Sequence, residues 1–169
     1  MNKIFLTVIA MVLIGLGLYA FAPKSQKPET NTTASGPQTP TYVDVEIKLN
    51  VEGRDISGKL VFEFPNLQRC QEESINNQSY IKDYSKQCDR DSLCKSVHVG
   101  SCSSFVDSKY ISMLNKQFSG SHYMHISDSK NPNERGVIAF WGLSDNEAEK
   151  VCTDTSKRTS EKNIITECL

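Results

Sequence analysis

The chain has almost no excess of charge of either sign, and it contains no long run of like charges. Among its 169 residues, 19 Lys and Arg stand against 20 Asp and Glu, so the formal net charge is −1. Residues 1–41 contain three of the lysines and one glutamate, which leaves the rest of the chain near −3. A basic surface that neutralises phosphates is therefore not indicated, and we expect no nucleic-acid partner.

Signatures of common catalytic and cofactor sites are also missing. The sequence has no G-x-S-x-G turn to activate a serine and no Gly-rich loop to hold a phosphate. His122 and His125 form H-x-x-H, but residues three apart on a strand point to opposite faces and do not share a metal ion. We therefore expect no cofactor and no metal, and we expect the folded part of the chain to bind or scaffold rather than catalyse.

An enzyme remains as an alternative, in the form of an envelope hydrolase of unrecognised type. Such an enzyme would gather His98, His122 or His125 with a carboxylate and a nucleophile in one concave site. The surroundings of the three histidines therefore separate the two interpretations.

One long hydrophobic run is present, from Ile4 to Ala22, and it carries no charge. As a helix it would span about 28 Å, close to the hydrocarbon thickness of a bilayer. Its last residues, Ala20-Phe21-Ala22, match a signal-peptidase site, but the run exceeds the usual signal-peptide core of about 7–15 residues. Pro23 would also follow the cut bond and lacks the N–H of an extended substrate. We predict an uncleaved signal anchor over residues 1–22, with a cleaved signal peptide as the alternative.

Six cysteines follow this run, and all lie on its C-terminal side. They are Cys70, Cys88, Cys94, Cys102, Cys152 and Cys168. An even number of cysteines on one side of an apolar segment is typical of disulfides formed in an oxidising compartment. We therefore expect a single-pass inner-membrane protein whose C-terminal domain lies in the periplasm or outside the cell, with another envelope protein as its partner.

Geometry limits how the cysteines pair. If Cys70 and Cys88 ended one continuous helix, they would lie about 27 Å apart, whereas bridged Cα atoms lie within about 7 Å. We expect both to pair with the two cysteines that follow them, in an order left open, and we favour a bond between Cys152 and Cys168. A structural zinc site is the alternative for the central group. Its ligands would be Cys88, Cys94, His98 and Cys102.

The rest of the chain divides into a tether and a folded domain. Residues 23–41 are rich in Pro, Thr, Ser and other polar residues, so they are predicted to be a disordered tether. The folded domain is predicted to cover residues 42–169. It begins with strict alternation of apolar and polar residues over 43–51 and 56–64, which predicts a β-hairpin that ends before Pro65.

Further strands and helices follow in irregular order. Strands are predicted over 96–102, 122–127, 137–143 and 163–169, and the third of these is apolar on both faces, as in a strand covered on each side. Helices are predicted over 67–88 and over 107–118, the second with Asp107 as its cap. Ser144 and Glu147 form a capping box that opens a last helix. The fold class is α+β, a mostly antiparallel sheet with two or three packed helices.

A short string near the middle of the domain carries a resemblance. Ser119-Gly120-Ser121-His122-Tyr123, followed downstream by Phe140-Trp141-Gly142, resembles the signature of the bacterial membrane-bound or periplasmic lysozyme inhibitors. The resemblance implies a small β-barrel with a signature loop that enters the lysozyme cleft. It makes Ser119, Tyr123 and Trp141 candidate partner-binding residues, and it requires Tyr123 to be exposed on a protruding loop. A glycine that ends a helix before a buried tyrosine is the alternative explanation.

Overall fold

The computed structural model describes most of the predicted folded domain. The described residues are 39–51, 53–74, 94–120, 122–129, 132–159 and 164–169. Within these ranges no helix is both long and apolar enough to cross a bilayer. The predicted anchor, nearly all of the predicted tether, and Cys88 lie outside the described residues.

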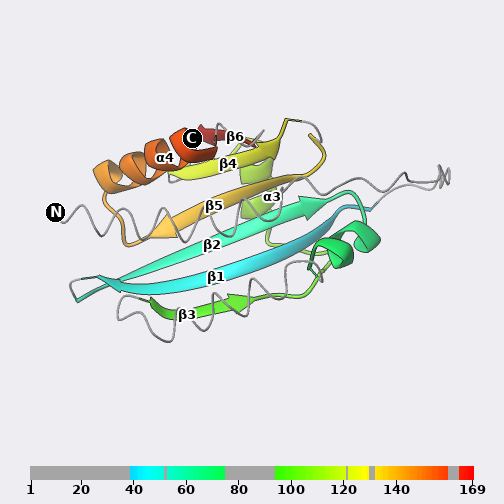
Figure 1. Ribbon diagram of the computed structural model, residues 1–169, viewed down its shortest axis with the longest axis horizontal. Coiled ribbons are helices and arrows are strands. Elements are labelled where there is room, and N and C mark those ends of the chain that lie inside the picture. The colour runs from blue at the N-terminus through cyan, green and yellow to red at the C-terminus, as the bar shows by residue number, and fades with distance from the viewer. Residues whose placement is uncertain (1–38, 52, 75–93, 121, 130–131, 160–163) are drawn as a thin grey trace.

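Six antiparallel strands form one sheet in the order β3-β1-β2-β5-β4-β6, with β3 and β6 at its edges (Figure 1). The strands are β1 (Thr41–Val51), β2 (Arg54–Phe64), β3 (Cys94–Val99), β4 (Tyr123–Asp128), β5 (Arg135–Trp141) and β6 (Ile164–Cys168). With helices packed on it, this sheet confirms the predicted α+β class.

The hairpin of β1 and β2 follows the alternation in the sequence. Val45 pairs with Leu60, and the register continues to Val51 opposite Arg54. Gly53 turns the chain with φ +81°, a conformation that glycine adopts without steric cost. The second strand ends before Pro65, as predicted, because proline offers no N–H to the ladder.

Each face of the sheet packs against a helix. On one face, α4 (Asp145–Thr159) covers β4, β5 and β6 with Val151 and Cys152 pointing inward. On the other face, α3 (Ser108–Leu114) covers β5 and β4 with Tyr110, Met113 and Leu114. Strand β5 therefore has buried side chains on both faces, as its apolar sequence predicted.

The start of α3 was predicted correctly and its end was not. Asp107 caps the helix by accepting a hydrogen bond from the backbone N–H of Lys109 at 2.9 Å. The helix ends at Leu114, rather than near Phe118, because Asn115 caps it and Lys116 adopts φ +58°. Within the helix, Ile111 is 39% exposed, whereas Met113 is buried.

Two other predicted elements differ from those observed. Residues 67–74 are helical, and the remainder of the helix predicted over 67–88 lies outside the described residues. The strand predicted over 96–102 runs instead from Cys94 to Val99. Gly100 continues the same register by donating to the carbonyl of Asp44, but the next pairing with β1 is an isolated bridge between Tyr42 and Ser103 that is shifted by one residue.

Disulfides fasten the elements around the sheet. Cys70 of the 67–74 helix is bonded to Cys102, and Cys152 of α4 is bonded to Cys168 of β6, the pair favoured from the sequence. Cys94 is also disulfide-bonded. Every cysteine that the structure describes is thus in a disulfide, so Cys94 and Cys102 offer no thiolate to the zinc site considered above.

Candidate binding site

The three histidines lie in three separate environments. His98 is exposed on edge strand β3, paired in register with Glu46 of β1. His122 precedes β4 and lines a cavity on the α4 side of the sheet. His125 is buried on the α3 side. His122 and His125 therefore serve opposite faces of the sheet, and the structure does not bring them together.

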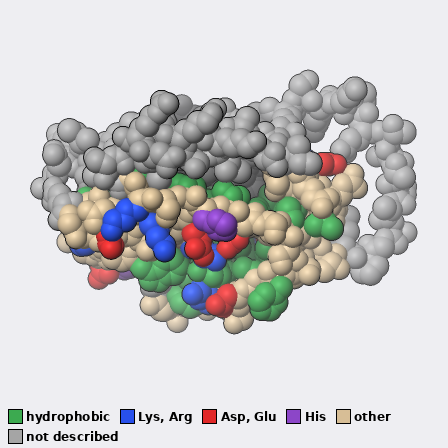
Figure 2. Space-filling model, turned by 90° about the horizontal axis from the view of Figure 1, so that it is seen from below, with side chains coloured by type: hydrophobic (Ala, Val, Ile, Leu, Met, Phe, Trp, Pro, Cys, Tyr) green, Lys and Arg blue, Asp and Glu red, His purple; other side chains and the backbone are tan. Residues whose placement is uncertain are grey.

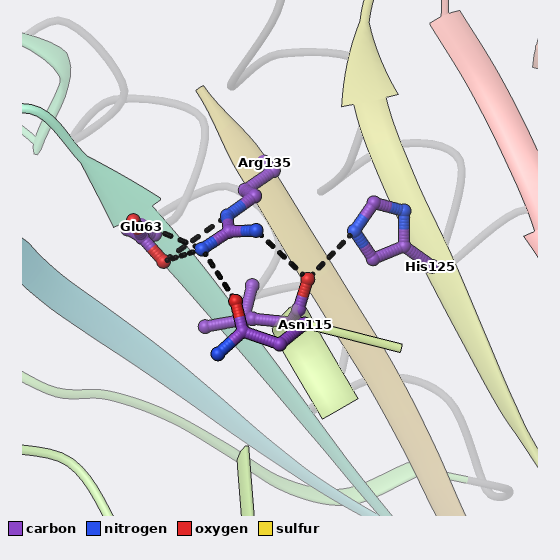
Figure 3. A network of polar contacts seen from close by, with 5 residues as sticks. Glu63, Asn115, His125 and Arg135 are labelled. Carbon is purple, nitrogen blue, oxygen red and sulfur yellow. Dashed lines mark hydrogen bonds and ion pairs between the residues drawn. The ribbon is translucent and has the colours of Figure 1, made fainter. Parts of the chain in front are cut away.

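His125 belongs to a polar network at the C-terminal end of α3 (Figure 3). Its Nε2 donates to the carbonyl of Leu114 at 3.2 Å, and Arg135 donates to the same carbonyl at 3.0 Å. Arg135 also donates to Glu63 at 3.0 Å and to the side-chain oxygen of Asn115 at 3.1 Å. These contacts hold the last turn of α3 against β2, β4 and β5.

The second ring nitrogen of His125 faces the carboxylate of Glu167. Nδ1 lies 3.7 Å from Oε2 of Glu167, and the same oxygen pairs with Lys116. Burial lowers the pKa of His125, and the charge of Lys116 lowers it further against the opposing effect of Glu167. The ring is thus favoured in its neutral form, with its proton on Nε2, which is a structural role rather than that of an exposed base.

The remaining part of the α3 side carries mixed charges. Lys59 pairs with Asp44 at 2.6 Å and with Glu46 at 2.9 Å. Viewed from the β3 side, side chains of both charges lie next to each other among hydrophobic ones (Figure 2). The described side chains in this view therefore create no extended potential of a single sign.

The N-terminus of α4 is fixed to the β1–β2 turn. The carboxylate of Glu147 accepts from the backbone N–H of Ser144 at 2.8 Å, which is one half of the predicted capping box. The hydroxyl of Ser144 donates to the same carboxylate at 2.9 Å, and the backbone N–H of Glu147 bonds to the carbonyl of Ser144. Arg54 donates to both oxygens of the same carboxylate, at 2.6 and 3.2 Å. The hydrogen bond from Arg54, followed by that from Ser144, lowers the pKa of Glu147 to about 2.

This depressed pKa predicts an acid-dependent stability. The unfolded chain binds the proton of Glu147 more readily than the folded one, so the stabilisation is present above about pH 5 and is lost as pH falls toward 2. Because Arg54 is 47% exposed, solvent screening limits the effect to about 1–2 kcal/mol. Urea unfolding should show Glu147→Gln less stable than the unmodified protein at pH 6, with the difference nearly gone at pH 2. A difference that stays constant across this range would contradict the assignment.

A cavity of about 170 Å³ lies at the end of the sheet where β5 leads into α4. We call it the end cavity. Its lining residues are His122, Tyr123, Met124, Ile138, Phe140, Asp145, Ala148, Glu149, Cys152, Cys168 and Leu169. Most of them are apolar, and the Cys152–Cys168 disulfide forms part of the wall.

One wall of the end cavity depends on a glycine. A Cβ at Gly58 would lie 2.8 Å from the ring of Phe140, so only glycine lets this ring lie across β2. The opposite wall is Ala148, whose short side chain leaves space between α4 and the sheet. The cavity is thus the result of a small residue on the helix and a ring that lies flat against the strands.

The mouth of the end cavity is polar. Nε2 of His122 lies 3.5 Å from Oδ1 of Asp145, and both side chains are largely exposed. Glu149 lines the same rim. Although this places an imidazole beside a carboxylate, no Ser, Thr, Lys or free thiol is among the described lining residues. The grouping required by the hydrolase alternative is therefore incomplete here.

The sequence-predicted partner-binding residues divide into exposed and buried ones. Ser119 is exposed, and Trp141 is 41% exposed with Nζ of Lys109 at 5.5 Å from its ring centroid. Tyr123 is only 4% exposed, because it begins β4 and its ring meets that of Phe118 edge-on. Tyr123 is therefore not on a protruding loop of the kind expected of a lysozyme inhibitor. It is buried, as the alternative explanation expected, but Gly120 does not end a helix, because α3 ends at Leu114.

Several residues of the site were not found from the sequence. Met124 and Ala148 carried no signal beyond that of ordinary core positions, Phe140 appeared only as part of the resemblance, and Lys109 was one of many lysines. Among the described residues, no group of three or more His, Cys, Asp or Glu is placed to hold a metal ion. A comparison with protein-family models finds no match for the chain, and a search of the curated proteins finds none either.

Proposed function

We propose that this chain is a membrane-anchored binding module of the cell envelope, without catalytic activity. Residues 4–22 are its anchor, and the disulfide-stabilised domain lies in the periplasm or outside the cell. The disulfides of all the described cysteines support this location, because such bonds persist in oxidising compartments. The partner is another envelope protein.

The end cavity is the observation that carries the binding role. Pockets for substrates and cofactors usually have volumes of about 300–1,000 Å³. At about 170 Å³, the end cavity is too small for such ligands. A cavity of similar size accepts a molecule as large as benzene, so the end cavity suits one side chain of a partner.

Exposed Trp141 at the same end of the sheet adds to this interpretation. Tryptophan is enriched among the residues that dominate binding energy at protein interfaces. Trp141 follows Phe140 directly in β5, so the exposed ring and the cavity wall come from adjacent residues on opposite faces. The contact surface is therefore assigned to this end of the domain.

A photo-cross-linker at position 141 tests the proposal. With p-benzoylphenylalanine in place of Trp141 in the native host, irradiation should give one discrete adduct with an envelope protein. The control places p-benzoylphenylalanine at position 67 instead. Leu67 is 51% exposed and lies just after the C-terminal end of β2. No adduct at position 141, or the same adducts from both positions, would reject the binding surface.

The same cells test the location. The chain should fractionate with membranes, and its cysteines should resist a membrane-impermeant maleimide until a reductant is added. Labelling before reduction, or recovery of the chain in the cytosol, would reject the proposed location.

A further inference from the structure

The end cavity combines an apolar interior with two rim carboxylates that form no ion pair with a described lysine or arginine. Asp145 contacts His122, and Glu149 has no ion pair with a described lysine or arginine. Nine other described carboxylates are paired with basic side chains. These nine are Asp44, Glu46, Asp55, Glu63, Glu73, Glu134, Glu147, Asp154 and Glu167. No described lysine or arginine lines the end cavity, so the charge on its rim is negative.

This distribution sets the charge of the ligand. The negative potential left at the rim attracts a cation, and the low-dielectric wall beside it strengthens the attraction. His122 lies beside Asp145, which leaves Glu149 as the rim carboxylate that is available to a ligand. An acidic ligand would be repelled by the same two groups.

The interior sets the shape of the ligand. Met124 and Ile138 line the interior, and both are almost inaccessible to water. Filling such a space with an apolar group gains the transfer free energy of that group and restores missing van der Waals contacts. A single ring or branched aliphatic side chain fits the volume of about 170 Å³.

We propose that the end cavity receives one aromatic or large aliphatic side chain from a basic segment of the partner protein. The apolar side chain enters between α4 and the sheet, and the flanking lysines or arginines of that segment contact Asp145 and Glu149. The inference rests on the proposed binding function and names the chemistry of its ligand.

Three short peptides test the inference on the full chain in phosphatidylcholine nanodiscs, which carry no net charge. The peptides are blocked Lys-Phe-Lys, Lys-Ala-Lys and Glu-Phe-Glu, titrated to several millimolar. Methyl NMR signals of Met124 and Ala148 report occupancy, because both side chains line the cavity. Only Lys-Phe-Lys should shift both signals in a saturable way. No shift, or equal shifts with either of the other peptides, would overturn the inference.

Two sets of variants locate the binding. Ala148→Leu fills the cavity and should abolish the shift of Met124. Asp145→Asn with Glu149→Gln should weaken binding about fivefold at low salt, whereas Glu72→Gln with Asp154→Asn removes the same charge away from the cavity and should leave binding unchanged. If Ala148→Leu does not fold, the charge variants still decide the outcome. If the peptides fail to bind but a cross-link forms at position 141, the ligand class alone is rejected. If the peptides fail to bind and no cross-link forms, the binding function is rejected as well.

Discussion

Replacing Arg69 with methionine should lower the free energy of unfolding by about 3 kcal/mol, because it leaves a buried carboxylate without its cation. Arg69 donates to both oxygens of Glu134, at 2.5 and 3.3 Å, and pairs with Glu73 at 3.1 Å. The side chain of Glu134 is 3% exposed, so water does not replace the lost partner. Because Arg69 itself is 38% exposed, the expected loss lies at the lower end of the range for buried pairs.

Chemical denaturation of two further variants tests the cause of this loss. Arg69→Met combined with Glu134→Gln should recover about half of the stability, because a neutral amide is less costly to bury than a carboxylate. Lys150→Met removes a cation from an exposed pair with Asp154 and should leave the unfolding midpoint nearly unchanged. An equal loss in Arg69→Met and in the double variant would show that packing, rather than charge, is responsible.

Removing the Cys70–Cys102 disulfide should have an effect of similar size. The two cysteines lie 32 residues apart, so in the chain-entropy account the bond stabilises the fold by about 3–4 kcal/mol. The variant Cys70→Ala with Cys102→Ala should therefore melt about 10–15 °C below the unmodified protein in a calorimetric scan. Alanine keeps the buried site of Cys70 free of a polar group.

The second disulfide is the internal comparison. Cys152 and Cys168 lie 16 residues apart, which predicts a smaller loss of about 3 kcal/mol for the matching double alanine variant. A larger loss at Cys152 and Cys168 than at Cys70 and Cys102 would contradict the entropic explanation and point to contacts in the folded state.

Local patterns predicted the elements whose burial follows directly from neighbouring residues. The hairpin of β1 and β2 was visible because strict alternation leaves only one face to bury. The burial of β5 on both faces and the hydrogen bond between Ser144 and Glu147 were predictable because they too depend on neighbouring residues. In each case the information lies within about a dozen consecutive residues.

The predicted end of α3 was wrong because residues distant in the sequence decide where this helix ends. The carbonyl of Leu114 is taken by His125 and Arg135, which lie on β4 and β5. These two contacts satisfy a helix-terminal acceptor that further helical turns would otherwise have used. Phe118 belongs to the helix predicted over 107–118, but in the structure it follows the end of α3 and packs on Tyr123.

The candidate site was the least predictable part. The end cavity needs β4, β5, β6 and α4 to converge, and no short stretch of sequence contains that convergence. The resemblance to lysozyme inhibitors pointed to Tyr123, which is core, and to Trp141, which is exposed. Short strings therefore located an exposed aromatic residue but not the surface around it.

The order of strands in the sheet has a consequence for biogenesis. β2 hydrogen-bonds to β5, with Leu60 opposite Ile138, so the two halves of the sheet join only after most of the chain has been synthesised. Until then the hairpin presents a bare apolar edge, and pairings between residues so distant in sequence form slowly. Folding of this chain therefore includes an interval in which the apolar edge of a half-built sheet is open to pairing with other polypeptides.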